Sequence, residues 1–399
     1  MKPSWWNNNY TVLMITWMGW ISIYLARSVL PPVLPVLSAE LGMTHAQSGL
    51  LETAYLIGYI ISKLPAGVLS DRYGPRRVLA SSMIGYGAAT FLISYAQGFT
   101  DIFALRFLVG LFQGVHLPVA NALLSDRFGD KQSRAIGFNE SGANVGNTLA
   151  FPVAVSILSV WGWRTAFMVL SVPAFLLSVA TFLFMKDEPK AHQTDDPEEN
   201  HNIREYLWVL IPYALSHATY NLVLRTTFTF IPSFLVEFKG MEVAAAGFMA
   251  MALPFAGIFA KMGSGFIVER TGPKYAICGA AALSAVFLAS LVWYPGESLL
   301  ALNLLVLGLT LYSFSPIIYS STTSSLPSGL KAMGLGLVTM FGNIVGAVST
   351  SVVGALIDGR GYGFTFLAIS AVTILASALI FAVMSKKYIG QHHLDGYVS

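Results

Sequence analysis

The stretch Gly67–Arg77 reads G-V-L-S-D-R-Y-G-P-R-R between two long apolar runs, and 198 residues further on Gly265–Lys274 reads G-F-I-V-E-R-T-G-P-K. Each copy predicts a helix that ends in an acid–base pair, a turn at Gly-Pro, and a second helix that begins with a cation. The same offset aligns four further pairs: Arg27 with Arg225, Lys63 with Lys261, Gly110 with Gly308, and Pro118 with Pro316. A repeat this long in an apolar chain indicates two copies of one membrane unit.

The composition is that of a membrane protein. Of 399 residues, 55% are hydrophobic and 11% charged, and the mean hydropathy is +0.64, whereas soluble domains are about 25% charged. The lone Cys278 permits no internal disulfide. The Gly-rich runs lie in predicted membrane helices and follow no strand. We therefore expect no enzymatic activity, no cofactor, no metal and no nucleic-acid partner.

The predicted fold is an all-α integral membrane protein of twelve transmembrane helices in two pseudo-symmetric six-helix bundles. The N-terminal bundle is predicted over 1–185, a cytoplasmic linker over the polar stretch 186–206, and the C-terminal bundle with a short cytoplasmic tail over 207–399. The predicted spans are 11–34, 49–69, 78–96, 101–122, 135–158, 164–185, 207–236, 244–268, 275–294, 299–322, 332–357 and 362–384.

The distribution of Lys and Arg predicts the orientation. With the N-terminus inside, fifteen of the 23 cations fall in cytoplasmic segments and three, Arg164, Lys239 and Arg360, in outside loops. Positive charge accumulates on the cytoplasmic side of membrane proteins. Both termini and the linker are therefore expected in the cytoplasm, with the protein in an inner or plasma membrane.

The loop G-x-L-S-D-R-x-G-P-R-R resembles the signature loop of the major facilitator superfamily. Its echo after the eighth span and the motif Arg106-x-x-x-Gly110-x-x-Gln113-Gly114 in the fourth span support this resemblance. In that superfamily the Asp-Arg loop braces the two halves in one of the alternating states. The resemblance therefore implies a gating role for Asp71, Arg72, Glu269 and Arg270; the alternative is a helix cap with a surface ion pair.

Five cations lie within the predicted spans: Arg27, Lys63, Arg106, Arg225 and Lys261. A charge at the bilayer centre costs at least about 2.5–3.5 kcal/mol, so each needs a partner, water or a substrate. Acids in the spans are fewer, with Glu52 near the outer end of the second span and Glu140 in the fifth. We therefore expect uncompensated positive charge and an anionic substrate. The alternatives are that the lysines snorkel to the interface and that the arginines bond backbone carbonyls.

The second span adds a polar face to this prediction. Glu52, Tyr55, Tyr59 and Lys63 follow i, i+3, i+7 and i+11, which places them on one side of a helix. We expect Arg27 and Arg225 to bind the anion, Lys63 and Lys261 to raise the local potential, and Tyr55 and Tyr59 to shape the pocket. Arginine suits this task because its planar fork donates two parallel hydrogen bonds to an oxyanion.

The placement of Arg27 and Arg225, with Ser62 and Lys63, resembles the organophosphate:phosphate antiporter branch of the superfamily. That resemblance implies an arginine on the first and seventh helices around a phosphoryl group. The fifth span departs from the pattern, because the cavity histidine of that family would fall at Ala143. Carboxylates, as carried by the related anion:cation symporters, therefore stay open beside organophosphates.

His116, Glu140 and Arg106 are the candidates for coupling to a proton. Histidine titrates near working pH, and an acid among cations can take a proton as the substrate leaves. The alternatives are that His116 is a packing residue and that Glu140 pairs with Arg106 or a cytoplasmic cation.

The expected function is secondary transport of a small organic or phosphate-bearing anion, by proton-coupled symport or anion exchange, by a monomer in the lipid bilayer. A proton-driven exporter of lipophilic compounds is the alternative. Such an exporter would use an acid in an apolar cavity, and the two arginines and two lysines within the spans argue against it. A channel or sensor on the same scaffold would usually need an appended soluble domain. The sequence leaves open the identity of the anion, the direction of transport and the coupling ion.

Overall fold

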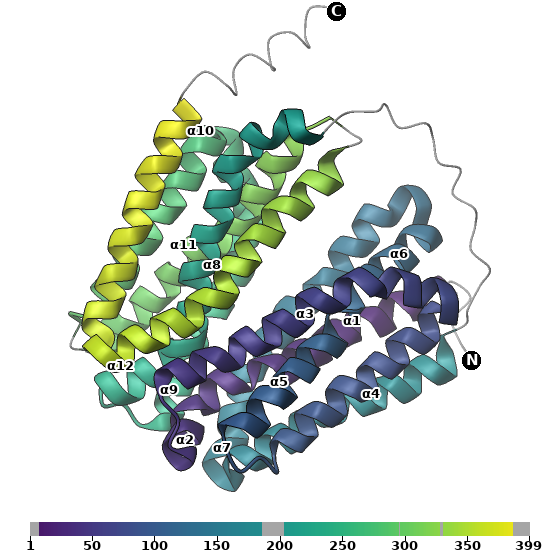
Figure 1. Ribbon diagram of the computed structural model, residues 1–399, viewed down its shortest axis with the longest axis horizontal. Helices are drawn as coiled ribbons and strands as arrows, with labels where there is room; N and C mark the ends of the chain where they lie inside the picture. The colour runs from purple at the N-terminus through teal and green to yellow at the C-terminus, as the bar shows by residue number, and fades with distance from the viewer. Residues whose placement is uncertain (1–7, 186–202, 295, 328–329, 386–399) are drawn as a thin grey trace, which may run out of the picture. The chain divides into compact units, whose positions relative to one another are not determined.

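The computed structural model describes residues 8–185, 203–294, 296–327 and 330–385, and within these ranges the chain forms helices and turns but no strand (Figure 1). The α-helices are α1 Asn8–Ser28, α2 Leu30–Leu41, α3 His45–Tyr73, α4 Pro75–Ile93, α5 Phe99–Gln113, α6 His116–Phe128, α7 Gln132–Phe184, α8 Leu207–Ser233, α9 Val243–Ala250, α10 Ala252–Ser290, α11 Glu297–Ser324 and α12 Lys331–Ser385. Short 3₁₀ helices cover Gly129–Lys131 and Ile203–Tyr206, and a π-helix covers Phe234–Phe238.

Both Gly-Pro turns form as predicted. Gly74 ends α3 with φ 84° and ψ 143°, and the following Pro75 begins α4. Gly272 has φ 77° and ψ 159° inside α10, again directly before a proline. A positive φ is costly for any residue with a Cβ, and proline is preorganised for the first position of a helix. The two copies of the repeat therefore make the same local structure.

The helices overlap the predicted spans but differ from them in their bounds: some helices join two spans, and the spans 11–34, 101–122 and 244–268 are each divided between two helices. In the described ranges, eight helical segments are long and apolar enough to cross a membrane. Two of them, Arg134–Phe184 and Met333–Met384, each contain two predicted spans that are joined at Gly162 (φ 80°) or Gly361 (φ 74°). The helices α3 and α4 are not among the eight; α3 carries charged side chains along its length.

The chain divides into two compact units, Met1–Gln193 with Pro232–Met251, and Thr194–Ile231 with Ala252–Ser399. Pro232–Met251, which lies within the predicted C-terminal bundle, packs with the first unit. The contact is close: a Cβ on Gly247 of α9 would lie 2.3 Å from Val155 Cγ2 of α7. Most of the predicted linker, 186–202, lies outside the described residues.

The cation after each Gly-Pro turn lies over an aromatic ring near the end of a long helix in both units. In the first unit Arg76 donates to the backbone oxygen of Phe182 near the end of α7, and its guanidinium lies 4.6 Å from the Phe182 ring centroid. In the second unit Lys274 Nζ lies 3.7 Å from the ring centroid of Phe381, near the end of α12. A cation at a helix C-terminus is favourable because the last carbonyls lack partners there.

The long kinked helices present apolar side chains outward. Only 33% of the residues in the apolar windows of α7 and α12 are buried inside the protein. Leu176 and Leu183 of α7 and Leu375 of α12 are more than half exposed. Such surfaces suit contact with lipid, where apolar exposure carries no penalty.

Candidate functional site

Glycines allow α3 and α5 to pack with their backbones in close contact. A Cβ on Gly110 would lie 1.9 Å from the Tyr55 carbonyl oxygen, and one on Gly114 would lie 2.3 Å from the Tyr59 oxygen. From the other side, a Cβ on Gly58 would lie 2.3 Å from the Phe107 oxygen. Close approach through small residues is a common way for membrane helices to pack. The glycines of the fourth-span motif thereby bring its arginine and glutamine within reach of α3.

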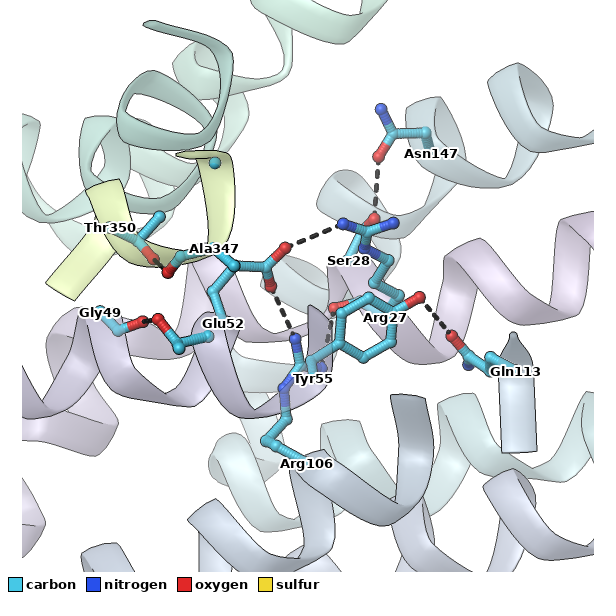
Figure 2. A network of polar contacts seen from close by, with 12 residues as sticks. Arg27, Ser28, Gly49, Glu52, Tyr55, Arg106, Gln113, Asn147, Ala347 and Thr350 are labelled. Atoms are coloured by element: carbon cyan, nitrogen blue, oxygen red, sulfur yellow. Dashed lines mark hydrogen bonds and ion pairs between the residues drawn. The ribbon is translucent and has the colours of Figure 1, made fainter. Parts of the chain in front are cut away.

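Glu52 of α3 is shared by two arginines (Figure 2). Its Oε1 accepts from Arg27 at 2.8 Å, and its Oε2 accepts from Arg106 at 3.0 Å. Arg106 also donates to the Arg27 backbone oxygen at 3.4 Å. Arg106 is fully buried, and Arg27 and Glu52 are 7% and 6% exposed. The group of Arg27, Glu52 and Arg106, which we call the arginine cluster, therefore holds two positive charges and one negative charge away from solvent.

The aromatic ring of Tyr55 packs against both arginines of the arginine cluster. Its ring centroid lies 4.4 Å from the Arg27 guanidinium carbon and 4.9 Å from that of Arg106, so both cations face the ring. The Tyr55 hydroxyl donates to Gln113 Oε1 at 3.0 Å, and Gln113 Nε2 donates to the Ile23 carbonyl at 3.2 Å. These bonds fix the ring between α1, α3 and α5, and Figure 2 shows Glu52 and Gln113 on opposite sides of it.

This arrangement gives both arginines an acidic partner that the sequence analysis did not assign to them. Glu52 is buried at the centre of the cluster, not peripheral, because α5 packs against α3 at the glycines. The charge of Arg27 is thus partly compensated by Glu52, which leaves a net positive charge of one on the three side chains. Arg106, one of the two kinds of partner considered for Glu140 from the sequence, has Glu52 as an acidic partner.

The face of α3 extends from the cluster toward Lys63 as predicted. The rings of Tyr55 and Tyr59 stack with centroids 5.9 Å apart, and Lys63 Nζ lies 4.5 Å from the Tyr59 centroid. Lys63 and its counterpart Lys261 on α10 are both half-buried. The lysines therefore occupy matching positions in the two units, at neither full burial nor full exposure.

The polar fifth span packs on α1. A Cβ on Gly142 would lie 2.4 Å from the Trp17 oxygen and one on Gly146 would lie 2.5 Å from the Ile21 oxygen. Ser28, the residue after Arg27, donates to Asn147 Oδ1 at 2.8 Å. The glycines and asparagines of N-E-S-G-A-N-V-G-N thus hold α7 against the helix that carries Arg27.

His116 and Glu140, two of the three coupling candidates, lie in different surroundings. His116 is 1% exposed at the start of α6, with Nε2 3.1 Å from the Thr16 oxygen and its ring edge-on to Trp20 at 5.1 Å. A Cβ on Gly19 would lie 2.5 Å from the His116 ring, so this glycine makes room for it. These contacts favour the packing alternative. Glu140 is exposed on α7.

The second unit holds a polar row that the sequence analysis missed. His217, Asn221 and Arg225 follow i, i+4 and i+8 on α8, and the first two are each 2% exposed. His217 Nε2 lies 3.2 Å from the Tyr319 hydroxyl of α11, and Asn221 Nδ2 donates to the His217 oxygen at 3.0 Å. The regular spacing is visible in the sequence, but a count of the charged residues alone does not include the neutral His217 and Asn221.

The predicted gating residues lie at the surface. Asp71 and Arg72 at the end of α3, and Glu269 and Arg270 before the Gly272 kink, are all exposed. The Arg72 guanidinium lies 5.3 Å from the ring centroid of the neighbouring Tyr73. Their places at equivalent ends of α3 and of the first part of α10 follow the repeat.

A cavity of about 680 Å³ lies in the first unit, away from the arginine cluster. It is lined by α2, the start of α3 and the segment around the π-helix, and includes Glu40, His45 and Glu237. His45 Nε2 lies 2.7 Å from Glu237 Oε2 at its wall. Across the described ranges, no group of three or more His, Cys, Asp and Glu side chains could hold a metal ion.

Several known proteins resemble the chain over nearly its full length. The hexuronate transporter of Bacillus subtilis is 23% identical, covering 92% of this chain and 93% of that protein. The niacin transporter of Acinetobacter baylyi is 24% identical over 93% of each. The D-galactonate transporter of Escherichia coli is 23% identical over 98% of each.

Solved structures share the fold at lower identity. A bacterial homologue of the human lysosomal transporter Spinster, inward-facing and unoccupied, matches with a TM-score of 0.84 and 16% identity, covering 94% of this chain and 97% of that one. A D-xylose–proton symporter matches with a TM-score of 0.78 and 14% identity, over 94% and 97%. Residues 16–350 match the Major Facilitator Superfamily itself. The chain is therefore an integral membrane protein that belongs to the Major Facilitator Superfamily.

Proposed function

We propose that this protein is a secondary transporter of a small organic carboxylate. The observation that carries the proposal is the arginine cluster, in which two guanidinium groups buried in membrane-length helices share a single carboxylate. Ionisable groups at such depth are expensive and usually mark a substrate or ion pathway. A second carboxylate, brought by the substrate, would neutralise the remaining charge.

The substrate class follows from the chemistry of the cluster and from the relatives. An arginine that donates to the Glu52 carboxylate presents the geometry that a substrate carboxylate needs. Hexuronate, D-galactonate and niacin, for which the three relatives are named, all carry a carboxylate. This favours carboxylates over the organophosphates that the sequence had left open.

We assign substrate binding to Arg27 and to its repeat counterpart Arg225. Lys63 and Lys261 add positive potential nearby, and Tyr55 and Tyr59 supply an aromatic surface. We propose twelve transmembrane helices in two bundles, which open the substrate site to each side of the membrane in turn. Both termini and the linker lie in the cytoplasm, and the protein lies in the inner or plasma membrane. The Asp71 and Glu269 loops brace the alternating states.

Coupling is proposed to act through the counter-ion of Arg27. An arriving carboxylate competes with Glu52 for the Arg27 guanidinium, while Arg106 can retain Glu52 through its second oxygen. A proton on Glu52 would weaken its hold on Arg27 and so favour substrate binding. Glu52 is thus a better candidate for the coupled proton than the exposed Glu140 or the packed His116.

A counterflow experiment tests the proposal. Purified protein in proteoliposomes would be loaded with sugar acids, dicarboxylates, aromatic carboxylates, sulfonates, sugar phosphates and a lipophilic cation in turn, and uptake of the matching labelled compound would be measured. We expect accumulation with at least one carboxylate, and loss of that signal in Arg27→Gln. Accumulation with sugar phosphates alone would contradict the substrate class, and accumulation of lipophilic cations would favour the exporter.

A further inference from the structure

The two neutral members of the polar row, His217 and Asn221, together with Tyr319 of α11, have the composition of a hydroxyl-binding site and not of an anion-binding site. Imidazole, amide and phenol groups are neutral donors and acceptors that pair well with hydroxyls, whereas carboxylates favour guanidinium and ammonium groups. On an α-helix, four residues correspond to a rise of about 6 Å. Asn221 therefore lies one turn from the proposed carboxylate ligand Arg225, and His217 lies two turns away.

The hydrogen bonds of the row leave one acceptor available. Asn221 Nδ2 is engaged by His217, through the backbone oxygen at 3.0 Å and the ring nitrogens at 3.3 Å. Asn221 Oδ1 makes no hydrogen bond among the described residues. Tyr319, which contacts the other side of His217, is 36% exposed. His217 itself is thus buried, whereas Tyr319 and the half-buried Arg225 on either side of it are accessible.

Two glycines of α12 make room for the row. A Cβ on Gly342 would lie 2.0 Å from His217 Nδ1, and a Cβ on Gly346 would lie 3.0 Å from Asn221 Cβ and 3.3 Å from Arg225 Cγ. Glycine at both positions lets α12 pack over the three polar residues of α8, which are spaced four residues apart, without displacing them. The close packing of α12 on α8 at this row therefore depends on these two glycines.

The row belongs to one copy of the repeat only. At the offset that aligns Arg225 with Arg27, Asn221 aligns with Ile23 and His217 with Gly19. Features that serve the fold recur in both units, as the cations after the Gly-Pro turns do. A polar row present in one unit alone is better explained by recognition of an asymmetric ligand.

We propose that Asn221 and Tyr319, positioned by His217, recognise hydroxyl groups of the substrate beside the carboxylate held by Arg225. The inference rests on the proposed function and narrows it to hydroxylated carboxylates. A site whose polar groups are matched to a substrate hydroxyl rejects the analogue that lacks it, because those groups are then left unpaired.

Matched pairs of probes test this. Tartrate and succinate share a four-carbon dicarboxylate and differ only in two hydroxyls, and gluconate and hexanoate form a second pair. Affinities for each would be measured with the purified full-length protein. We expect the wild type to prefer the hydroxylated member of at least one pair by about tenfold or more. Tyr319→Phe and Asn221→Leu should each reduce that preference about fivefold, the value of one neutral hydrogen bond.

Controls separate recognition from folding. Affinity for the member without hydroxyls should stay within about twofold in both variants, because one ordinary hydrogen bond is the only interaction removed. Asn303→Leu removes another buried asparagine of the same unit, which donates to Ser290 at 2.7 Å, and should leave the preference intact. Should Asn221→Leu fail to fold, Tyr319→Phe, which deletes one oxygen, decides the matter alone.

The outcomes also separate this inference from the proposed function. Binding of aromatic carboxylates without any preference for hydroxylated members would overturn the hydroxyl subsite and leave carboxylate transport standing. An unchanged preference in Tyr319→Phe and Asn221→Leu would also overturn it. Failure to bind any carboxylate at all would overturn both.

Discussion

Replacing Glu52 with glutamine removes the one acid of the arginine cluster and keeps the shape of the side chain. At an effective dielectric constant of about 20, each contact at 2.8 or 3.0 Å corresponds to a gross attraction of roughly 6 kcal/mol. Desolvation of the buried charges offsets most of this, and removing one partner of a buried ion pair typically costs about 3–5 kcal/mol. The amide oxygen of glutamine can still accept one hydrogen bond, so we expect a loss of about 3 kcal/mol without substrate.

The same substitution should strengthen anion binding. In the wild type the substrate must displace Glu52 from Arg27, whereas in Glu52→Gln the guanidinium has no carboxylate to release. A gain of tenfold in affinity corresponds to about 1.4 kcal/mol, less than the lost attraction to Glu52. Anion at a hundred times its dissociation constant would restore about 2.7 kcal/mol of stability. Glu52→Gln should therefore be unstable without substrate and largely rescued by it.

Thermal unfolding with and without substrate measures the change in stability, and equilibrium binding of the substrate measures the change in affinity. Glu140→Gln is the matched control, since it neutralises an exposed acid of the same unit; it should change stability by less than about 0.5 kcal/mol. Transport driven by a pH gradient should fail in Glu52→Gln and persist in Glu140→Gln, while exchange at equal concentrations continues in both. Weaker anion binding in Glu52→Gln would refute the competition between the carboxylates.

Three further predictions concern the other parts of the site. Arg27→Gln or Arg225→Gln should abolish substrate binding in protein that still inserts and elutes as a folded species; near-normal affinity in both variants would contradict their assignment. Asp71→Asn should slow turnover more than it changes affinity, because it lies exposed at the end of α3; a tenfold change in affinity at unchanged turnover would be inconsistent with gating. Gly110→Ala should reduce stability by about 1–3 kcal/mol or more, since its Cβ would lie 1.9 Å from the Tyr55 oxygen, whereas Gly67→Ala, in open space on α3, serves as the control.

The sequence predicted the local structure well because that structure depends on neighbours in the chain. Glycine followed by proline specifies the turns at Gly74 and Gly272, and both formed. The helical spacing of Tyr55, Tyr59 and Lys63 predicted one face of α3, and the stacked rings confirm it. Local rules of backbone conformation and helical periodicity are sufficient for such features.

Partners on different helices could not be predicted in the same way. Glu52 lies near one end of its span by sequence, and only the close approach of α3 and α5 places it between two arginines. The spacing of His217 and Asn221 could be read from the chain, but their contacts with α11 and α12 could not. Contacts between helices depend on which faces pack, and here glycines at the interfaces determine this.

The repeat gives both units an arginine at the same position, yet the surroundings of the two arginines differ. Arg27 is buried with a carboxylate and a second arginine, so its environment is dominated by charge. Arg225 is half-buried and follows a row of neutral polar groups on its own helix. A net charge acts on every anion alike, whereas neutral hydrogen bonds depend on where the substrate places its hydroxyls. We therefore expect substitutions in the arginine cluster to alter the affinity for all carboxylates together, and substitutions of the neutral residues His217 and Asn221 to alter the order of affinities among carboxylates.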